Sequence, residues 1–126
     1  MYNSETAEVK QFATAKVSPK HIWQEAVLAC RQAVKEFTDK HGEPMYCGFA
    51  NVKIRPARGN FVKFLKAEGI GSNGYNGGWR ISYYDMMGNE QYSHTQSMDI
   101  KEHGCDAFAE VLNKYGMDAH MESRAD

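Results

Sequence analysis

The chain has no strong excess of charge, because its 15 lysines and arginines nearly balance its 16 aspartates and glutamates, for a formal net charge of −1. Proteins that bind nucleic acid stably usually show a clear basic excess, so such a partner is not expected. No apolar run approaches the ~20 residues of a membrane-spanning helix. Residues 1–5 lack the charged and apolar regions of a secretory signal. These absences predict a cytoplasmic protein without a membrane partner.

Cysteine is scarce and unpaired in the sequence. Cys30, Cys47 and Cys105 are far apart and form no C-x-x-C motif, which argues against a disulfide framework and a zinc knuckle. We expect reduced, mostly buried thiols. The five histidines form no H-E-x-x-H motif and share no helix face at ligand spacing. The sequence therefore predicts no bound metal and no cofactor.

Catalytic motifs are missing as well. There is no G-x-S-x-G nucleophile motif and no Gly-Lys-Ser/Thr that would complete a Walker A loop. Residues 69–74 formally match G-x-G-x-x-G, but they follow an expected helix and precede an expected strand, which is the reverse of a dinucleotide-binding fold. We expect a binding protein rather than an enzyme. A hydrolase assembled from residues distant in sequence remains an alternative.

The 126 residues fit a single domain. Residues 1–17 have weak periodicity and predict a loose arm or a short helical turn. Residues 18–41 predict a long helix, which Ser18 caps and Gly42 ends. Its apolar residues recur every four and three positions, and they are Trp23, Val27, Cys30, Val34 and Phe37. Such a heptad seam either faces the core or forms an oligomerisation element with a second copy.

Residues 43–126 predict the ligand-binding core. Hydrophobic alternation and turn residues predict helices at 61–68 and 100–115 and strands at 46–54, 79–86, 91–98 and 117–122. Strands 79–86 and 91–98 are expected to pair as a hairpin. The expected fold is α+β: a small antiparallel or mixed sheet of about four strands, with the long N-terminal, short middle and C-terminal helices packed on it.

A glycine-rich loop at 69–78 lies between basic residues and an aromatic strand. It is either a flexible connection or a set of backbone amides suited to an anion. Arg55 and Arg58 flank Pro56, and their guanidinium groups suit a phosphate, although a solvated surface pair is the alternative.

Aromatic and amide side chains extend this candidate ligand site. Trp79 and Tyr83 are candidates for stacking on a base, with core packing as the alternative. Gln96 is expected to serve as a polar contact. Arg124 lies in a tail that is either frayed or ordered by a partner subunit. The candidate ligand-binding residues are therefore Arg55, Arg58, Trp79, Tyr83, Gln96 and Arg124.

Several short stretches carry a resemblance to a known family. They are 43–50 (EPMYCGFA), 61–66 (FVKFLK), 77–79 (GGW), 96–102 (QSMDIKE), 107–112 (AFAEVL) and 123–126 (SRAD). Together they resemble the first-named Thoeris anti-defence family, the phage sponge proteins, over about residues 43–126. No pocket residue is assigned position by position through this resemblance.

The resemblance implies a function. Sponge proteins bind a cyclic ADP-ribose immune signal in the host bacterium without cleaving it, and they are oligomers with pockets at a dimer interface. Some members also hold cyclic oligonucleotides at separate sites. The expected partners are thus a cyclic nucleotide and a second copy of the chain, in the cytoplasm of the infected host. The alternatives are a protein-binding phage inhibitor of a host enzyme and a small nucleotide or single-stranded nucleic-acid binding protein.

Overall fold

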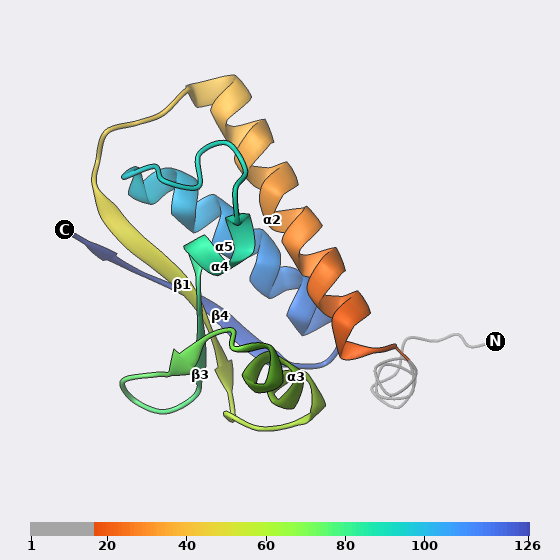
Figure 1. The fold of residues 1–126 in the computed structure, drawn as a ribbon. Helices are drawn as coiled ribbons and strands as arrows, with labels where there is room; N and C mark the ends of the chain where they lie inside the picture. Colours follow the sequence, from red (N-terminus) through yellow and green to blue (C-terminus); the bar gives the residue numbers. More distant parts are fainter. Residues whose placement is uncertain (1–16) are drawn as a thin grey trace.

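The computed structural model describes residues 17–126, so the arm expected at 1–17 lies outside it except for Val17. The helices are α2 (Pro19–His41), α3 (Asn60–Glu68), α4 (Tyr83–Met87) and α5 (Met98–Lys114). The strands are β1 (Gly48–Arg55), β2 (Ser72–Asn73), β3 (Trp79–Ser82) and β4 (Asp118–Ala125) (Figure 1). The expected α+β class is confirmed.

The four strands form one antiparallel sheet in the order β2-β3-β1-β4. β1 lies in the interior and pairs along its full length with β4, from Gly48 opposite Ala125 to Arg55 opposite Asp118. The C-terminal strand therefore forms one edge of the sheet (Figure 1). The sequence left Arg124 in a tail that is either frayed or ordered by a partner subunit. In the structure it lies on this strand opposite Phe49 of its own chain.

One face of the sheet is the core. Alternate residues of the strands point toward α5, and Val52, Ile54 and Ile81 are almost completely buried there. Helix α5 contacts β1 and β4, and α2 packs alongside α5 (Figure 1). The opposite face of the sheet carries polar side chains, such as the neighbouring pair Lys53 and Arg80.

Helices α2 and α5 approach closely at Gly104. A Cβ atom at this position would lie 3.0 Å from both Cys30 Sγ and Val34 Cγ2. Cys30, Val34 and the rest of the heptad seam therefore face the core of their own chain, and Val27 is buried with them. Of the two expectations for the seam, core packing is the one the fold realises.

Two sequence expectations about the sheet are wrong. The strand expected at 79–86 ends at Ser82, because a capping box there begins helix α4. Ser82 Oγ accepts a hydrogen bond from the Asp85 N–H at 3.1 Å, and an Asp85 carboxylate oxygen accepts one from the Ser82 N–H at 3.4 Å. This local pair outweighs the strand propensity of Tyr83 and Tyr84.

The strand expected at 91–98 is also wrong, and with it the hairpin. The Ser93 N–H donates to Glu90 O at 3.0 Å and the Thr95 N–H donates to Tyr92 O at 3.2 Å, so this segment is a series of turns. The fourth strand is β2, a two-residue segment inside the glycine loop. The last strand extends to Ala125, beyond the expected end at residue 122.

Candidate functional site

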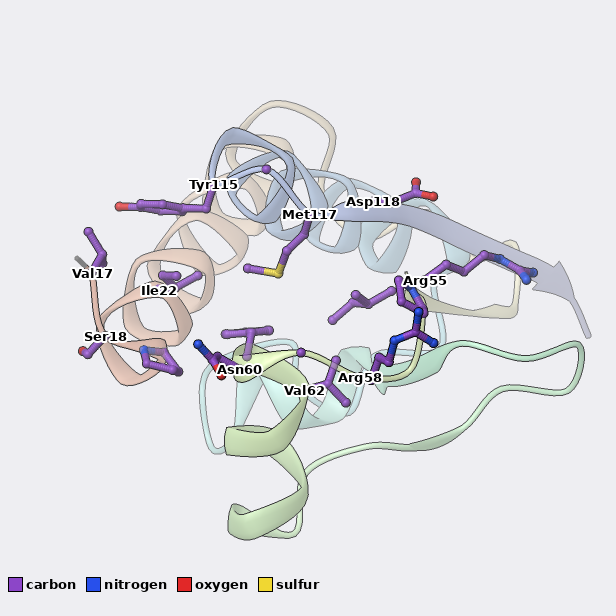
Figure 2. A pocket seen from close by; sticks show the side chains of 16 residues that line it. Val17, Ser18, Ile22, Arg55, Arg58, Asn60, Val62, Tyr115, Met117 and Asp118 are labelled. Carbon is purple, nitrogen blue, oxygen red and sulfur yellow. The ribbon is translucent and has the colours of Figure 1, made fainter. Parts of the chain in front are cut away.

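A cavity of about 650 Å³ lies between the start of α2, the start of α3 and the turn after α5 (Figure 2). Its wall is largely apolar, with Val17, Ile22, Ile54, Val62 and Met117. Ligand pockets of proteins commonly span 300–1,000 Å³, are mostly apolar and carry a few polar groups that orient the ligand. The volume and lining of this cavity are therefore those of a small-molecule site.

The polar groups of the cavity include the two arginines that the sequence selected. Arg55 ends β1, Arg58 lies in the turn before α3, and both are exposed on the same side of the cavity (Figure 2). The Arg55 Nη1 atom donates a hydrogen bond to Asn76 O in the glycine loop at 3.1 Å. Because neither guanidinium is enclosed, both are able to reorient toward the anionic group of a ligand.

Two helices begin at this cavity. Ser18 and Pro19 at the start of α2 line it together with Gly59 and Asn60 at the start of α3. The N-terminal end of a helix carries a partial positive charge. These ends add to the positive potential of the arginines, so the cavity suits a ligand that combines apolar and anionic parts.

Tyr115, on the wall formed by the turn after α5, is hydrogen-bonded to helix α2. Tyr115 lines the cavity, and its hydroxyl donates to Glu25 Oε1. Lys114 forms an ion pair with the same carboxylate. Hydrogen bonds from Lys114 and Tyr115 lower the pKa of Glu25. The bond to Glu25 in turn raises the pKa of Tyr115 to about 12, which keeps its hydroxyl protonated.

The glycine loop lies over one lysine of β1. A Cβ atom at Gly78 would lie 2.8 Å from Lys53 Cγ, and one at Gly74 would lie 2.9 Å from Lys53 Cε. The lysine is only 6% exposed, and its Nζ atom lies 3.4 Å from a Glu122 carboxylate oxygen. Cβ atoms at Gly78 and Gly74 would also lie 2.9 Å from Ile54 O and 2.4 Å from Gly77 O, so both positions require glycine.

Trp79 and Tyr83 lie in the core. The Trp79 indole N–H donates to Ile70 O at 3.0 Å, and the Tyr83 hydroxyl donates to Tyr92 O at 2.8 Å. Trp79 is 9% exposed and Tyr83 is fully buried. Burial raises the pKa of Tyr83. Neither ring offers a free face for stacking, which corresponds to the core-packing alternative.

Gln96 and Arg124 lie at the other end of β1, in a second hollow that we call the groove. It consists of two adjoining parts of about 580 and 400 Å³, both lined by Phe49 and Tyr84. Gln96 lines the first part and Arg124 the second, with its guanidinium carbon 5.8 Å from the centre of the Phe49 ring. The fold thus places Arg55 and Arg58 at one cavity and Gln96 and Arg124 in adjoining parts of the groove, but it does not bring all six candidates together.

Lys101 is a residue of the groove that the sequence reasoning missed. It is 2% exposed, and its Nζ atom donates to Gly48 O at 2.8 Å and to the Tyr84 hydroxyl at 3.1 Å. Among residues 17–126 no carboxylate forms an ion pair with it. Its position four and seven residues before Cys105 and Phe108 is the signal that could have revealed it, because these residues form the buried stripe of α5.

Within the described part of the chain, no helix is long and apolar enough to span a membrane. No three histidine, cysteine, aspartate or glutamate side chains gather as metal ligands in residues 17–126. Comparison with known protein families, with curated proteins and with solved structures gives no match to this chain.

Proposed function

We propose that this protein is a phage anti-defence protein that binds and sequesters a cyclic nucleotide immune signal, such as a cyclic ADP-ribose isomer, in the cytoplasm of the infected bacterium. The observation that carries the proposal is the cavity of about 650 Å³ with Arg55 and Arg58 on one side and an apolar wall on the other. Cyclic ADP-ribose combines a pyrophosphate with an adenine and two riboses. The arginines suit the pyrophosphate, and the apolar wall suits the base.

Sequestration without cleavage fits the chemistry of the thiols. Burial raises the pKa of Cys30 to about 12 and also raises the pKa of Cys105, so neither is a reactive thiolate at neutral pH. Cys47 is half-buried, with its thiol turned toward Met45 O and Gln96 Oε1 at 3.6 and 3.7 Å. Unreactive thiols support a sponge, which we expect to return its ligand unchanged.

A release experiment tests the proposal. Purified protein is mixed with lysate of signal-producing cells, washed and heat-denatured, and the supernatant is analysed by mass spectrometry. We expect intact cyclic nucleotide. We also expect Arg55→Ala and Arg58→Ala each to weaken binding of the purified signal by about tenfold or more, since a charge-assisted hydrogen bond contributes roughly 1.5–3 kcal/mol.

The matched control is Arg80→Ala, which removes the same charge from the outer face of the sheet and away from the cavity. We expect it to bind normally. Arg80 also lines the second part of the groove, so loss of binding in Arg80→Ala with full binding in Arg55→Ala and Arg58→Ala would assign the ligand to the groove. A degraded nucleotide in the supernatant would contradict sequestration, and an empty supernatant would contradict nucleotide binding.

A protein-binding inhibitor of a host enzyme is the second candidate function. Large apolar side chains are exposed around the start of β1, where Met45 is 76%, Tyr46 60% and Phe49 42% exposed. Tyr84, which lines the groove with Phe49, is 45% exposed. Exposed apolar groups gathered in this way are typical of protein-binding surfaces. Retention of one host protein on the wild-type chain, lost in Tyr46→Ser, would favour this function over the sponge.

A further inference from the structure

Strand β4 leaves part of one edge without a hydrogen-bond partner. Its residues Glu122–Ala125 are exposed, and β1 pairs with it on the other side only. An open edge of this kind presents unpaired N–H and C=O groups to any strand that reaches it. Natural sheets usually cover or interrupt such an edge. An eight-residue edge strand is therefore a candidate for pairing with another strand.

The backbone direction of each residue follows from two contacts. The Asp126 N–H donates to Cys47 O at 3.2 Å. The backbone N–H and C=O groups of the even-numbered residues of β4 are therefore directed toward β1. The N–H and C=O groups of Ala119 are directed away from β1, because both are hydrogen-bonded to the Asn113 side chain, at 2.8 and 2.9 Å. The backbone groups of the odd-numbered residues are therefore directed toward the open edge. At Ala119 these groups are already hydrogen-bonded to Asn113.

Beyond Ala119 the edge is open. Among residues 17–126, no backbone hydrogen bond outside the sheet involves Met121, Ser123 or Ala125. These three residues offer three N–H and three C=O groups with the two-residue spacing of an antiparallel ladder. The outer edge thus contains a short, free pairing segment that begins where the Asn113 side chain stops.

The charges on this segment select its partner. Two copies could pair antiparallel about a two-fold axis at Met121. Ser123 would then lie opposite Ala119 of the second copy, whose N–H and C=O are already hydrogen-bonded to Asn113. With the axis at Glu122, this carboxylate would lie opposite its own copy. With the axis at Ser123, Glu122 lies opposite Arg124 of the second copy, twice over. Opposite charges across an antiparallel pair stabilise it, and like charges destabilise it.

The same axis places His120 opposite Asp126 of the second copy and leaves the Asn113 cap intact. We propose that two copies of this chain dimerise through antiparallel pairing of their β4 edges about Ser123, forming one continuous sheet of eight strands. The dimer joins at the sheet edge and leaves helix α2 outside the interface. The inference does not depend on which ligand the cavity binds.

The first test removes one outward N–H. Ser123→Pro deletes an amide that takes no part in the β1–β4 ladder, and proline is tolerated on a sheet edge. Ser123→Ala is the matched control, since it also removes the Ser123 hydroxyl, which donates to Glu102 Oε2 at 2.6 Å, but keeps the amide. By sedimentation velocity we expect dimers of wild type and Ser123→Ala, and a folded monomer of Ser123→Pro at the same concentrations.

The second test exchanges the charges. Arg124→Glu places a carboxylate opposite Glu122 of the second copy, and we expect the dimer Kd to rise roughly tenfold. Glu122→Arg combined with Arg124→Glu restores opposite charges, and we expect recovery to within about threefold of wild type. Thermal unfolding of each variant checks its fold, because Glu122 also lies 3.4 Å from Lys53 Nζ.

The outcomes separate cleanly. A wild-type chain that is monomeric throughout, or a Ser123→Pro variant that stays dimeric, overturns the proposal. A folded charge-swap variant that fails to recover overturns the register about Ser123. Where the swap variant unfolds, the comparison of Ser123→Pro with Ser123→Ala still decides, because neither variant changes a charge.

Discussion

The cavity and the groove lie at opposite ends of β1, and both contain cations, but these cations have different surroundings. Arg55 and Arg58 at the cavity are exposed. Lys101 at the groove is 2% exposed and bonded to Gly48 O and the Tyr84 hydroxyl. Two donors of Lys101 are used within the fold, whereas an exposed guanidinium remains available to a ligand. Arg55 and Arg58 should therefore respond to mutation differently from Lys101.

Removing the buried cation should have the largest effect on stability. Lys101→Met keeps much of the side-chain length but leaves Gly48 O without its donor in a buried position. We expect the free energy of unfolding to fall by about 2–3 kcal/mol, as for a buried hydrogen bond to a charged group. Urea denaturation followed by circular dichroism measures it.

The control for this change is Lys63→Met on the exposed face of α3, which we expect to alter stability by less than about 0.5 kcal/mol. A Lys101→Met protein that is as stable as wild type but no longer binds the cyclic nucleotide would reverse the comparison. The groove would then hold the ligand, and the cavity would be a packing defect beside α3.

The elements that the sequence predicted well are those with local signals. Helix α2 begins after the capping residue Ser18 and ends at Gly42, which has a positive φ. Both signals depend on only a few neighbouring residues. Helix α4 was not predicted, because the alternation of Trp79, Ile81 and Tyr83 indicates a strand, although Ser82 and Asp85 form a capping box. Both signals are local, and the folded chain realises the capping box.

The candidate site was less predictable, because its contacts are distant in sequence. Arg55 and Arg58 are three residues apart and flank a proline, so their joint position at one cavity was foreseeable. Lys101 meets Gly48 and Tyr84 only after α5 packs on the sheet. No spacing in the sequence reports that contact, although the position of Lys101 on the apolar stripe of its helix hinted at burial.

A smaller effect is expected at the cavity wall formed by the turn after α5. The pKa of Glu25 is lowered in the folded protein by hydrogen bonds from Lys114 and Tyr115, so the carboxylate contributes stability above its unfolded pKa. This contribution is lost as the pH falls through the lowered folded value. Glu25→Gln should cost about 1 kcal/mol at pH 7.

Urea denaturation of wild type and Glu25→Gln at a series of pH values measures this contribution. The difference between the two proteins should shrink as the pH falls below about 4.5, the ordinary value for a glutamate. Glu36→Gln, on the exposed face of α2, is the control for removing a carboxylate from the same helix. A difference that stays constant from pH 7 to pH 3 would contradict the assigned pKa direction.

The smallest effect on stability is expected where the effect on binding is expected to be largest. Arg55→Ala removes one hydrogen bond to Asn76 O at 3.1 Å, and both guanidinium groups are exposed. Exposed contacts of this kind contribute little, so Arg55→Ala and Arg58→Ala should each change the free energy of unfolding by less than about 0.5 kcal/mol. The two exposed arginines bring like charges to one side of the cavity, so removing one also relieves repulsion.

A loss of more than about 1 kcal/mol in either variant would mean that these arginines support the fold as Lys101 does. Part of their loss of ligand binding would then be a structural effect, so the stability measurement is needed to interpret the binding result.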